Sequence, residues 1–119
     1  MYQFSFEKLN VWQKARELTK KVYKITSNFP KEENFCLTNQ IRRASISVCS
    51  NLAEGSSRRS DKEQQYFYQI SYSSLMELLN QFIVSRDLDY ISDDDLEVIR
   101  TDVQLISILH TKLRESLST

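Results

Sequence analysis

The chain has 119 residues, enough for one domain spanning residues 1–119 with its own hydrophobic core. A single glycine and a single proline argue against a β-rich fold with many tight turns, and no apolar run approaches the roughly 18 residues of a membrane span. The net charge is zero, yet residues 1–60 carry 11 basic and 5 acidic side chains while residues 61–119 carry 5 and 11. The N-terminus has neither a basic start nor a continuous apolar segment, so we expect a cytoplasmic protein with no membrane association.

Two amphipathic stretches occupy the first half. The first has apolar residues at helical spacing and is closed by Pro30, because the residue before a proline avoids the helical region. Its members are Val11, Ala15, Leu18, Val22, Ile25 and Phe29, with Trp12 alongside. The second predicts a helix stopped by Gly55, with a stripe of Leu37, Ile41, Ala44, Val48 and Leu52.

Two further helices are expected in the second half. Ser60 and Glu63 form a capping box for the third, whose stripe is Phe67, Ile70, Ser74, Leu78 and Phe82. Ser92, with three aspartates after it, suits the start of the fourth, whose stripe is Leu96, Ile99, Val103, Ile106, His110, Leu113 and Leu117. Short connections favour antiparallel neighbours, so the sequence predicts an all-α, up-down-up-down four-helix bundle.

The last two helices are more apolar than one bundle core requires. The additional side chains are Tyr66, Tyr68, Tyr72, Leu75, Leu79 and Ile83 on the third helix and Val98, Leu105, Ile108 and Leu109 on the fourth. A helix that is apolar on more than one face is generally buried on more than one side. We therefore expect a homo-oligomer.

A polar row borders the apolar stripe of the second helix. Arg43, Ser47, Asn51 and Glu54 follow one another at spacings of 4, 4 and 3, which places them on one side of the helix. In an antiparallel hairpin turning near residue 58, Arg43 comes level with about residue 73, and Glu77 lies within about a turn of it. We favour a structural ion pair between Arg43 and Glu77 over a ligand-binding role. Asn51 predicts a hydrogen bond across helices that fixes their register.

The candidates for catalysis or metal binding are few. Cys36 and Cys49 are too far apart on one helix for a disulfide and are most simply buried apolar side chains. His110 lies within an apolar stripe, which favours a core or interface histidine. Ser107 stands where the Glu-x-x-His pair of di-iron bundles would need its glutamate, and one glycine cannot make a phosphate loop. We expect no catalytic residues, no metal, no cofactor and no enzymatic activity.

Basic residues gather in the first half of the chain. They are Lys14, Arg16, Lys20, Lys21 and Lys24 on the first helix, with Arg42, Arg58 and Arg59 on or just after the second. Lys14, Lys21 and Lys24 share a side of their helix, with Lys20 beside them. The cluster could follow a phosphate backbone, or it could be a solvated face or pair with the acidic helices.

Several short motifs occur in a fixed order. They are Phe6-Glu-Lys-Leu-x-Val-Trp12-Gln-Lys-Ala15, Phe29-Pro30, Leu37-Thr-x-Gln40-x-Arg-Arg-Ala44, Ser47-Val-x-Ser-Asn51-Leu-Ala-Glu-Gly55 with Arg58, and Ser74-Leu-x-Glu77-Leu. This order resembles the four-helix-bundle family of 23S ribosomal-RNA intervening-sequence proteins, related to the accessory variability determinant proteins of diversity-generating retroelements. The chain departs from the family pattern at Cys49, where proline is common, and at Ser57 and Ser73, where glycine is frequent. The resemblance implies a homopentameric barrel of bundles and, for some relatives, association with nucleic acid through basic residues.

The basic half and the resemblance together predict a non-enzymatic, oligomeric protein that binds RNA, DNA or a ribonucleoprotein electrostatically. The alternative is a protein–protein scaffold without a nucleic-acid role, whose apolar faces serve only oligomerisation and protein contacts.

Overall fold

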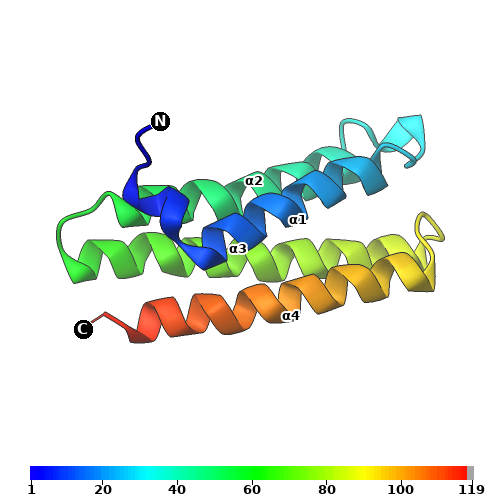
Figure 1. The fold of residues 1–119 in the computed structure, drawn as a ribbon. Helices are drawn as coiled ribbons and strands as arrows, with labels where there is room; N and C mark the ends of the chain where they lie inside the picture. The colour runs from blue at the N-terminus through cyan, green and yellow to red at the C-terminus, as the bar shows by residue number, and fades with distance from the viewer. Residues whose placement is uncertain (118–119) are drawn as a thin grey trace.

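The computed structural model describes residues 1–117, which form an antiparallel bundle of four α-helices (Figure 1). The helices are α1 (Asn10–Thr26), α2 (Leu37–Ser56), α3 (Asp61–Asp87) and α4 (Asp93–Glu115), and short 3₁₀ helices η1 (Ser5–Lys8) and η2 (Lys31–Glu33) precede α1 and α2. The bundle is elongated, with extents of 44 × 27 × 24 Å. The predicted all-α, up-down-up-down arrangement is confirmed, and no helix of the described residues is long and apolar enough to cross a membrane.

Serine side chains begin α3 and α4 as expected. The Ser60 hydroxyl accepts the Glu63 N–H at 3.1 Å, and the Ser92 hydroxyl accepts the Asp95 N–H at 3.0 Å. Each bond satisfies a backbone donor that the first turn of a helix leaves free.

Gly55 does not stop α2, which continues to Ser56. It is buried, and a Cβ atom built on it would lie 2.6 Å from Cε1 of Tyr68 and 3.1 Å from Cβ of Phe67. α2 thus ends within one residue of the expected stop, but Gly55 is itself helical and does not end the helix. The glycine is required because α3 packs against this turn of α2 with no room for a side chain.

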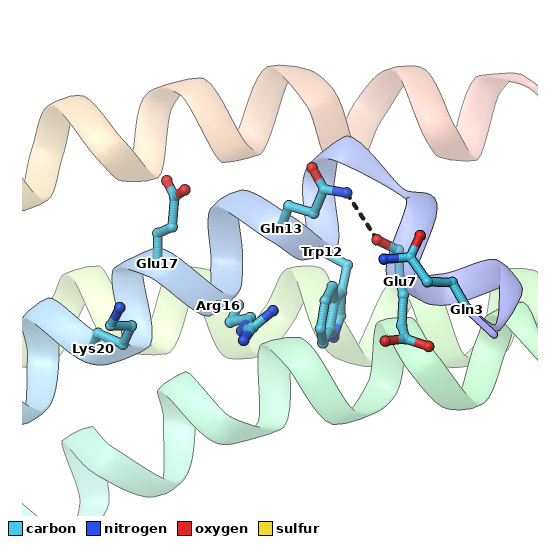
Figure 2. Close-up of a pocket in the computed structure, with 7 residues that line it drawn as sticks. All are labelled: Gln3, Glu7, Trp12, Gln13, Arg16, Glu17 and Lys20. Atoms are coloured by element: carbon cyan, nitrogen blue, oxygen red, sulfur yellow. Dashed lines mark hydrogen bonds between the residues drawn. The ribbon is translucent and has the colours of Figure 1, made fainter. Parts of the chain in front are cut away.

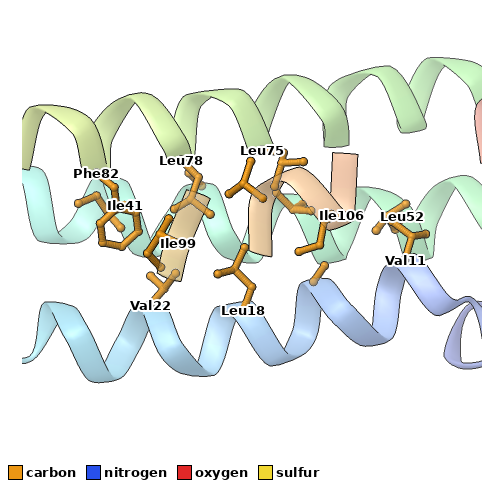
Figure 3. Packing of buried hydrophobic residues seen from close by; sticks show 14 of the residues in the cluster. Val11, Leu18, Val22, Ile41, Leu52, Leu75, Leu78, Phe82, Ile99 and Ile106 are labelled. Atoms are coloured by element: carbon orange, nitrogen blue, oxygen red, sulfur yellow. The ribbon is translucent and has the colours of Figure 1, made fainter. Parts of the chain in front are cut away.

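The core follows the predicted stripes of α1, α2 and α4, as Figure 3 shows for the packed aliphatic side chains. On α3 the first half of the stripe is shifted by one residue. Tyr68, Ser71 and Leu75 are buried, whereas Phe67 and Ile70 are only half-buried. Ser71 can be buried because its hydroxyl donates to the Val48 carbonyl at 2.8 Å, where α2 and α3 meet.

Candidate nucleic-acid interface

The outer side of α1 carries a row of three cations, Arg16, Lys20 and Lys24. They are spaced four residues apart, or about 6 Å along the helix axis, and all three are exposed. Figure 2 shows Arg16 and Lys20 on the side of α1 that faces α2, and Glu17 on the side that faces α4. Lys20 and Lys24 have no ion-pair partner among residues 1–117, so their charges are free to meet an external anion.

Two guanidinium groups on this side lie over aromatic rings. Arg16 is 5.5 Å from the ring centroid of Trp12, and Arg42 of α2 is 4.6 Å from that of Tyr23. Arg42 also donates to the hydroxyl of Thr26 at 2.9 Å and to the Tyr23 carbonyl at 3.3 Å. The ring contacts and hydrogen bonds hold these long side chains in place across α1 and α2, which lowers the entropy cost of a further contact.

We call this surface the α1–α2 basic face; it consists of Trp12, Arg16, Lys20, Tyr23, Lys24 and Arg42. A shallow hollow adjoins it, lined by Gln3, Glu7, Trp12, Gln13, Arg16, Glu17 and Lys20 (Figure 2). The hollow is shaped by a hydrogen bond from the Gln13 amide to the Glu7 backbone carbonyl at 2.8 Å.

Lys14 and Lys21 do not join this face. Nζ of Lys21 lies 2.8 Å from a carboxylate oxygen of Asp102 on α4, and Nζ of Lys14 lies 3.6 Å from Glu17. Lys14 and Lys21 do share a side of α1, since both line one hollow with Asp102, but their charges are paired with carboxylates whereas that of Lys24 is not. Lys21 thus pairs with the acidic helix α4, which was one of the alternatives that the sequence left open.

Arg58 and Arg59 lie at the turn between α2 and α3. The guanidinium of Arg58 is 3.4 Å from the carboxylate of Glu54 and 4.6 Å from the ring centroid of Phe67. Arg59 is exposed, with no ion-pair partner in the described part of the chain. These two cations therefore sit at the end of the bundle, apart from Arg42.

The predicted pair of Arg43 and Glu77 is not formed. Both side chains are exposed, and no ion pair between these two residues occurs in the structure. Glu77 instead accepts from the amide of Gln81 at 3.0 Å. The contacts of Ser47 with Ser74 and of Val48 with Ser71 put Arg43 level with Glu77, about one turn from the expected residue 73. Both side chains are exposed, so water solvates each charge without a partner.

Ser47 and Asn51 of the polar row form a hydrogen-bonded chain, whereas Glu54 pairs with Arg58. The Asn51 amide donates within α2 to the Ser47 carbonyl at 2.9 Å and to the Ser47 hydroxyl at 3.0 Å. The Ser47 and Ser74 hydroxyls lie 2.8 Å apart, and this contact alone crosses to α3. Asn51 thus reaches the neighbouring helix through Ser47 rather than directly, which corrects the prediction.

His110 is fully buried between α3 and α4. Its Nε2 lies 3.0 Å from the Ser71 hydroxyl, and because that hydroxyl donates its hydrogen to Val48, Nε2 must carry the proton and donate. Nδ1 then has a bare lone pair and no hydrogen-bond partner. Burial, reinforced by the positive charge of Arg114, lowers the pKa of His110 to about 4, so the ring is neutral and closed to solvent at pH 7.

The two cysteines differ in their surroundings. Cys49 is half-buried against the Thr19 hydroxyl, and burial raises the pKa of its thiol. Cys36 is exposed just before α2, so the expectation that both cysteines are buried is wrong for this one. Among the described residues, no group of three His, Cys, Asp or Glu side chains could hold a metal ion.

Sequence reasoning missed the stacked aromatics. Tyr23 was not singled out, although an antiparallel α1–α2 pair with a short connection brings it level with Arg42. The available signal was an aromatic residue between lysines on a helix whose apolar stripe it does not share.

Comparison with known proteins gives a consistent assignment. The model of the 23S rRNA-intervening sequence protein family matches residues 7–112, and that description names an RNA element and no reaction. A crystal structure of a protein of unknown function from the S23 ribosomal protein family of Bacteroides thetaiotaomicron has a similar fold, with a TM-score of 0.80 and 19% identity over 88% of this chain and 95% of that one. A comparison with curated proteins found no match. The chain belongs to the family of 23S rRNA-intervening sequence proteins.

Proposed function

We propose that this protein is a non-enzymatic homo-oligomer that binds RNA, alone or in a ribonucleoprotein, through the α1–α2 basic face. One observation carries the proposal: Lys20 and Lys24 are exposed and unpaired beside Arg16 and Arg42, whose guanidinium groups already rest on aromatic rings. The net charge of +6 on residues 1–60 and the family's connection with ribosomal RNA support it.

The binding should be strongly salt-dependent. Each phosphate that a lysine or arginine neutralises releases counterions and adds roughly 0.7–0.9 units to the slope of log affinity against log salt concentration. The face has a row of cations but no element that enters a groove, so backbone contacts should dominate and sequence preference should be weak.

A titration of a labelled structured RNA by fluorescence anisotropy at two salt concentrations tests this. We expect Lys20→Glu and Lys24→Glu each to weaken binding and to lower the salt slope by about one unit. Lys112→Glu is the matched control, because Lys112 is exposed on α4 and its reversal changes the net charge by the same amount. Absence of binding at low salt, or equal losses in all three variants, would contradict the proposal.

The oligomer contact that we propose lies on α3 and α4. Val98, Leu105 and Ile108 are between 43% and 48% exposed on α4, although their side chains are apolar. A groove between α3 and α4, lined partly by Tyr72, Met76 and Leu79, is the second part of the proposed contact. Tyr68 and Leu75, expected to contribute to this contact, are instead buried in the core of the subunit. The number of subunits, five, follows from the family resemblance alone.

Light scattering tests the assembly. We expect Leu105→Lys to dissociate the oligomer while helix content stays largely intact, because truncating or charging a central interface residue typically costs ~2 kcal/mol or more. Val84→Lys is the control, since Val84 is similarly exposed but lies on α3, outside both the α3–α4 groove and the exposed apolar set of α4. A wild-type monomer at micromolar concentration would refute the claim.

The exposed apolar side chains of α4 also favour a second candidate function, a protein–protein scaffold with no nucleic-acid role. A scaffold predicts a partner that still co-purifies after nuclease treatment and no salt-sensitive binding of RNA. Purification from the native host with and without nuclease separates the two functions.

A further inference from the structure

The turn between α2 and α3 holds a second aromatic and basic surface, apart from the α1–α2 basic face. An apolar hollow there is lined by Arg58, Ser60, Lys62, Glu63, Tyr66 and Phe67. Tyr66 is 63% exposed, and its hydroxyl has no hydrogen-bond partner within residues 1–117. The hydroxyl is open to water, and the exposed ring is an apolar face available to a ligand.

The rings form a corner. The centroids of Tyr66 and Phe67 are 5.2 Å apart with an angle of 86° between the planes. The guanidinium of Arg58 lies 4.6 Å from the ring centroid of Phe67 and covers one face of that ring. The ring of Tyr66 is therefore the one left open to a ligand. A flat aromatic ligand that stacks on Tyr66 would thus have a guanidinium with several N–H donors close to its edge.

The corner is held in shape by the turn itself. The Gln64 amide donates to the Arg58 carbonyl at 2.9 Å, and Ser60 caps α3. Gly55 lets α3 pack against the end of α2 at this same point. A site fixed in this way loses little conformational freedom when a ligand binds.

The local charges are nearly balanced. The basic side chains are Arg58, Arg59 and Lys62, and the acidic ones are Glu54, Asp61 and Glu63. Charge attraction therefore contributes little, and binding must come mainly from stacking. Exposed aromatics with neighbouring arginines are the combination that binds the unpaired bases of single-stranded nucleic acid, with little sequence preference.

We propose that this hollow binds one unpaired base of the RNA, with Tyr66 as the stacking surface and Arg58 at the edge of the base. The inference rests on the proposed RNA-binding function and adds the form of RNA recognised: a duplex, held by the α1–α2 basic face, that carries a single-stranded end or bulge. The hollow shares no lining residue with the α3–α4 groove assigned to oligomer contacts, so the two surfaces do not compete.

Two RNA hairpins test the proposal, each titrated against wild type, Tyr66→Ala and Tyr66→Phe. Their strand ends at the loop side are joined by the same non-nucleotide linker, so that neither has unpaired loop bases; one is blunt and the other has a single-stranded 3′ tail. We expect wild type to bind the tailed hairpin more tightly, and Tyr66→Ala to lose about 5- to 100-fold in affinity for that hairpin only. Tyr66→Phe keeps the ring and should retain the preference. The salt slope should not change in either variant, because no charge is altered.

Each failure has a distinct meaning. If wild type binds the two hairpins equally, or Tyr66→Ala weakens both alike, the stacking site is wrong and the basic face stands. If wild type binds neither hairpin, the proposed function is wrong as well. If Tyr66→Ala loses subunits in light scattering without changing the preference for the tail, Tyr66 belongs to a subunit contact and the stacking site is refuted. Circular dichroism of Tyr66→Leu, which keeps apolar bulk, separates loss of stacking from loss of fold.

Discussion

Replacing His110 with leucine should remove a large part of the acid sensitivity of folding. The pKa of His110 falls from 6.5 to about 4 in the native bundle, because the charged ring would be buried beside Arg114. A histidine whose pKa is lowered by folding contributes its full stability above the unfolded pKa and loses it as pH falls toward the folded value. The loss should therefore occur between about pH 6.5 and pH 4.

The expected size follows from that shift. Each pH unit in this window is worth about 1.4 kcal/mol, so His110 should lower the free energy of unfolding by about 2 kcal/mol between pH 7.5 and pH 5. His110→Leu cannot take up a proton, and its side chain has a similar volume. The variant should therefore lack this fall, whatever its stability at neutral pH.

Urea unfolding followed by circular dichroism measures the difference. Wild type and His110→Leu are compared at pH 7.5, 6 and 5 at one fixed protein concentration, since unfolding of an oligomer depends on concentration. Carboxylates titrate alike in both proteins, so the difference between the two curves isolates His110. Parallel curves would refute the account of a buried, neutral histidine whose Nδ1 lacks a partner.

Three further substitutions test the packing. Gly55→Ala should lower the free energy of unfolding by about 1–3 kcal/mol, although alanine has the better helix propensity, because the new methyl group would overlap the buried ring of Tyr68. Unchanged stability in urea would contradict the close contact between α2 and α3. Arg43→Ala should change the unfolding free energy by less than ~0.5 kcal/mol, because the side chain is exposed and has no ion-pair partner in the described chain; a loss of ~3 kcal/mol would restore the ion pair with Glu77. Phe82→Ala should cost about 3–5 kcal/mol, since Phe82 is fully buried in the centre of the core, and a loss below ~1 kcal/mol would contradict that placement.

The fold was readable from the sequence because α1 and α2 each have a single apolar stripe and the main stripe of α4 is regular despite the apolar residues beside it. Val11 to Phe29 and Ile99 to His110 each repeat at helical spacing, and the structure buries most of those positions. On α3 the pattern is ambiguous, since apolar residues occupy more than one side of the helix. The buried side of α3 includes Ser71, whose hydroxyl donates to the Val48 carbonyl, and a tertiary hydrogen bond of this kind leaves no periodic signal in the sequence.

The candidate site was less predictable. Spacing along one helix placed Lys14, Lys21 and Lys24 together, but which cations remain free depends on what lies opposite them. Lys21 forms an ion pair with Asp102 of α4, which is 81 residues away in the chain. Likewise, the hairpin placed Arg43 within about a turn of Glu77, whereas the outward direction of both side chains depends on how α2 and α3 are rotated about their axes.

The small residues between α2 and α3 bear on the order in which the chain folds. The hydroxyl contact of Ser47 with Ser74 joins residues 27 apart, whereas the ion pair of Lys21 with Asp102 joins residues 81 apart. Closing the longer loop costs about 1 kcal/mol more in chain entropy, so we expect the α2–α3 hairpin to be structured in the transition state, before α1 and α4 meet. Substitutions at Gly55 or Ser74 should then slow folding, while substitutions between α1 and α4 should chiefly accelerate unfolding.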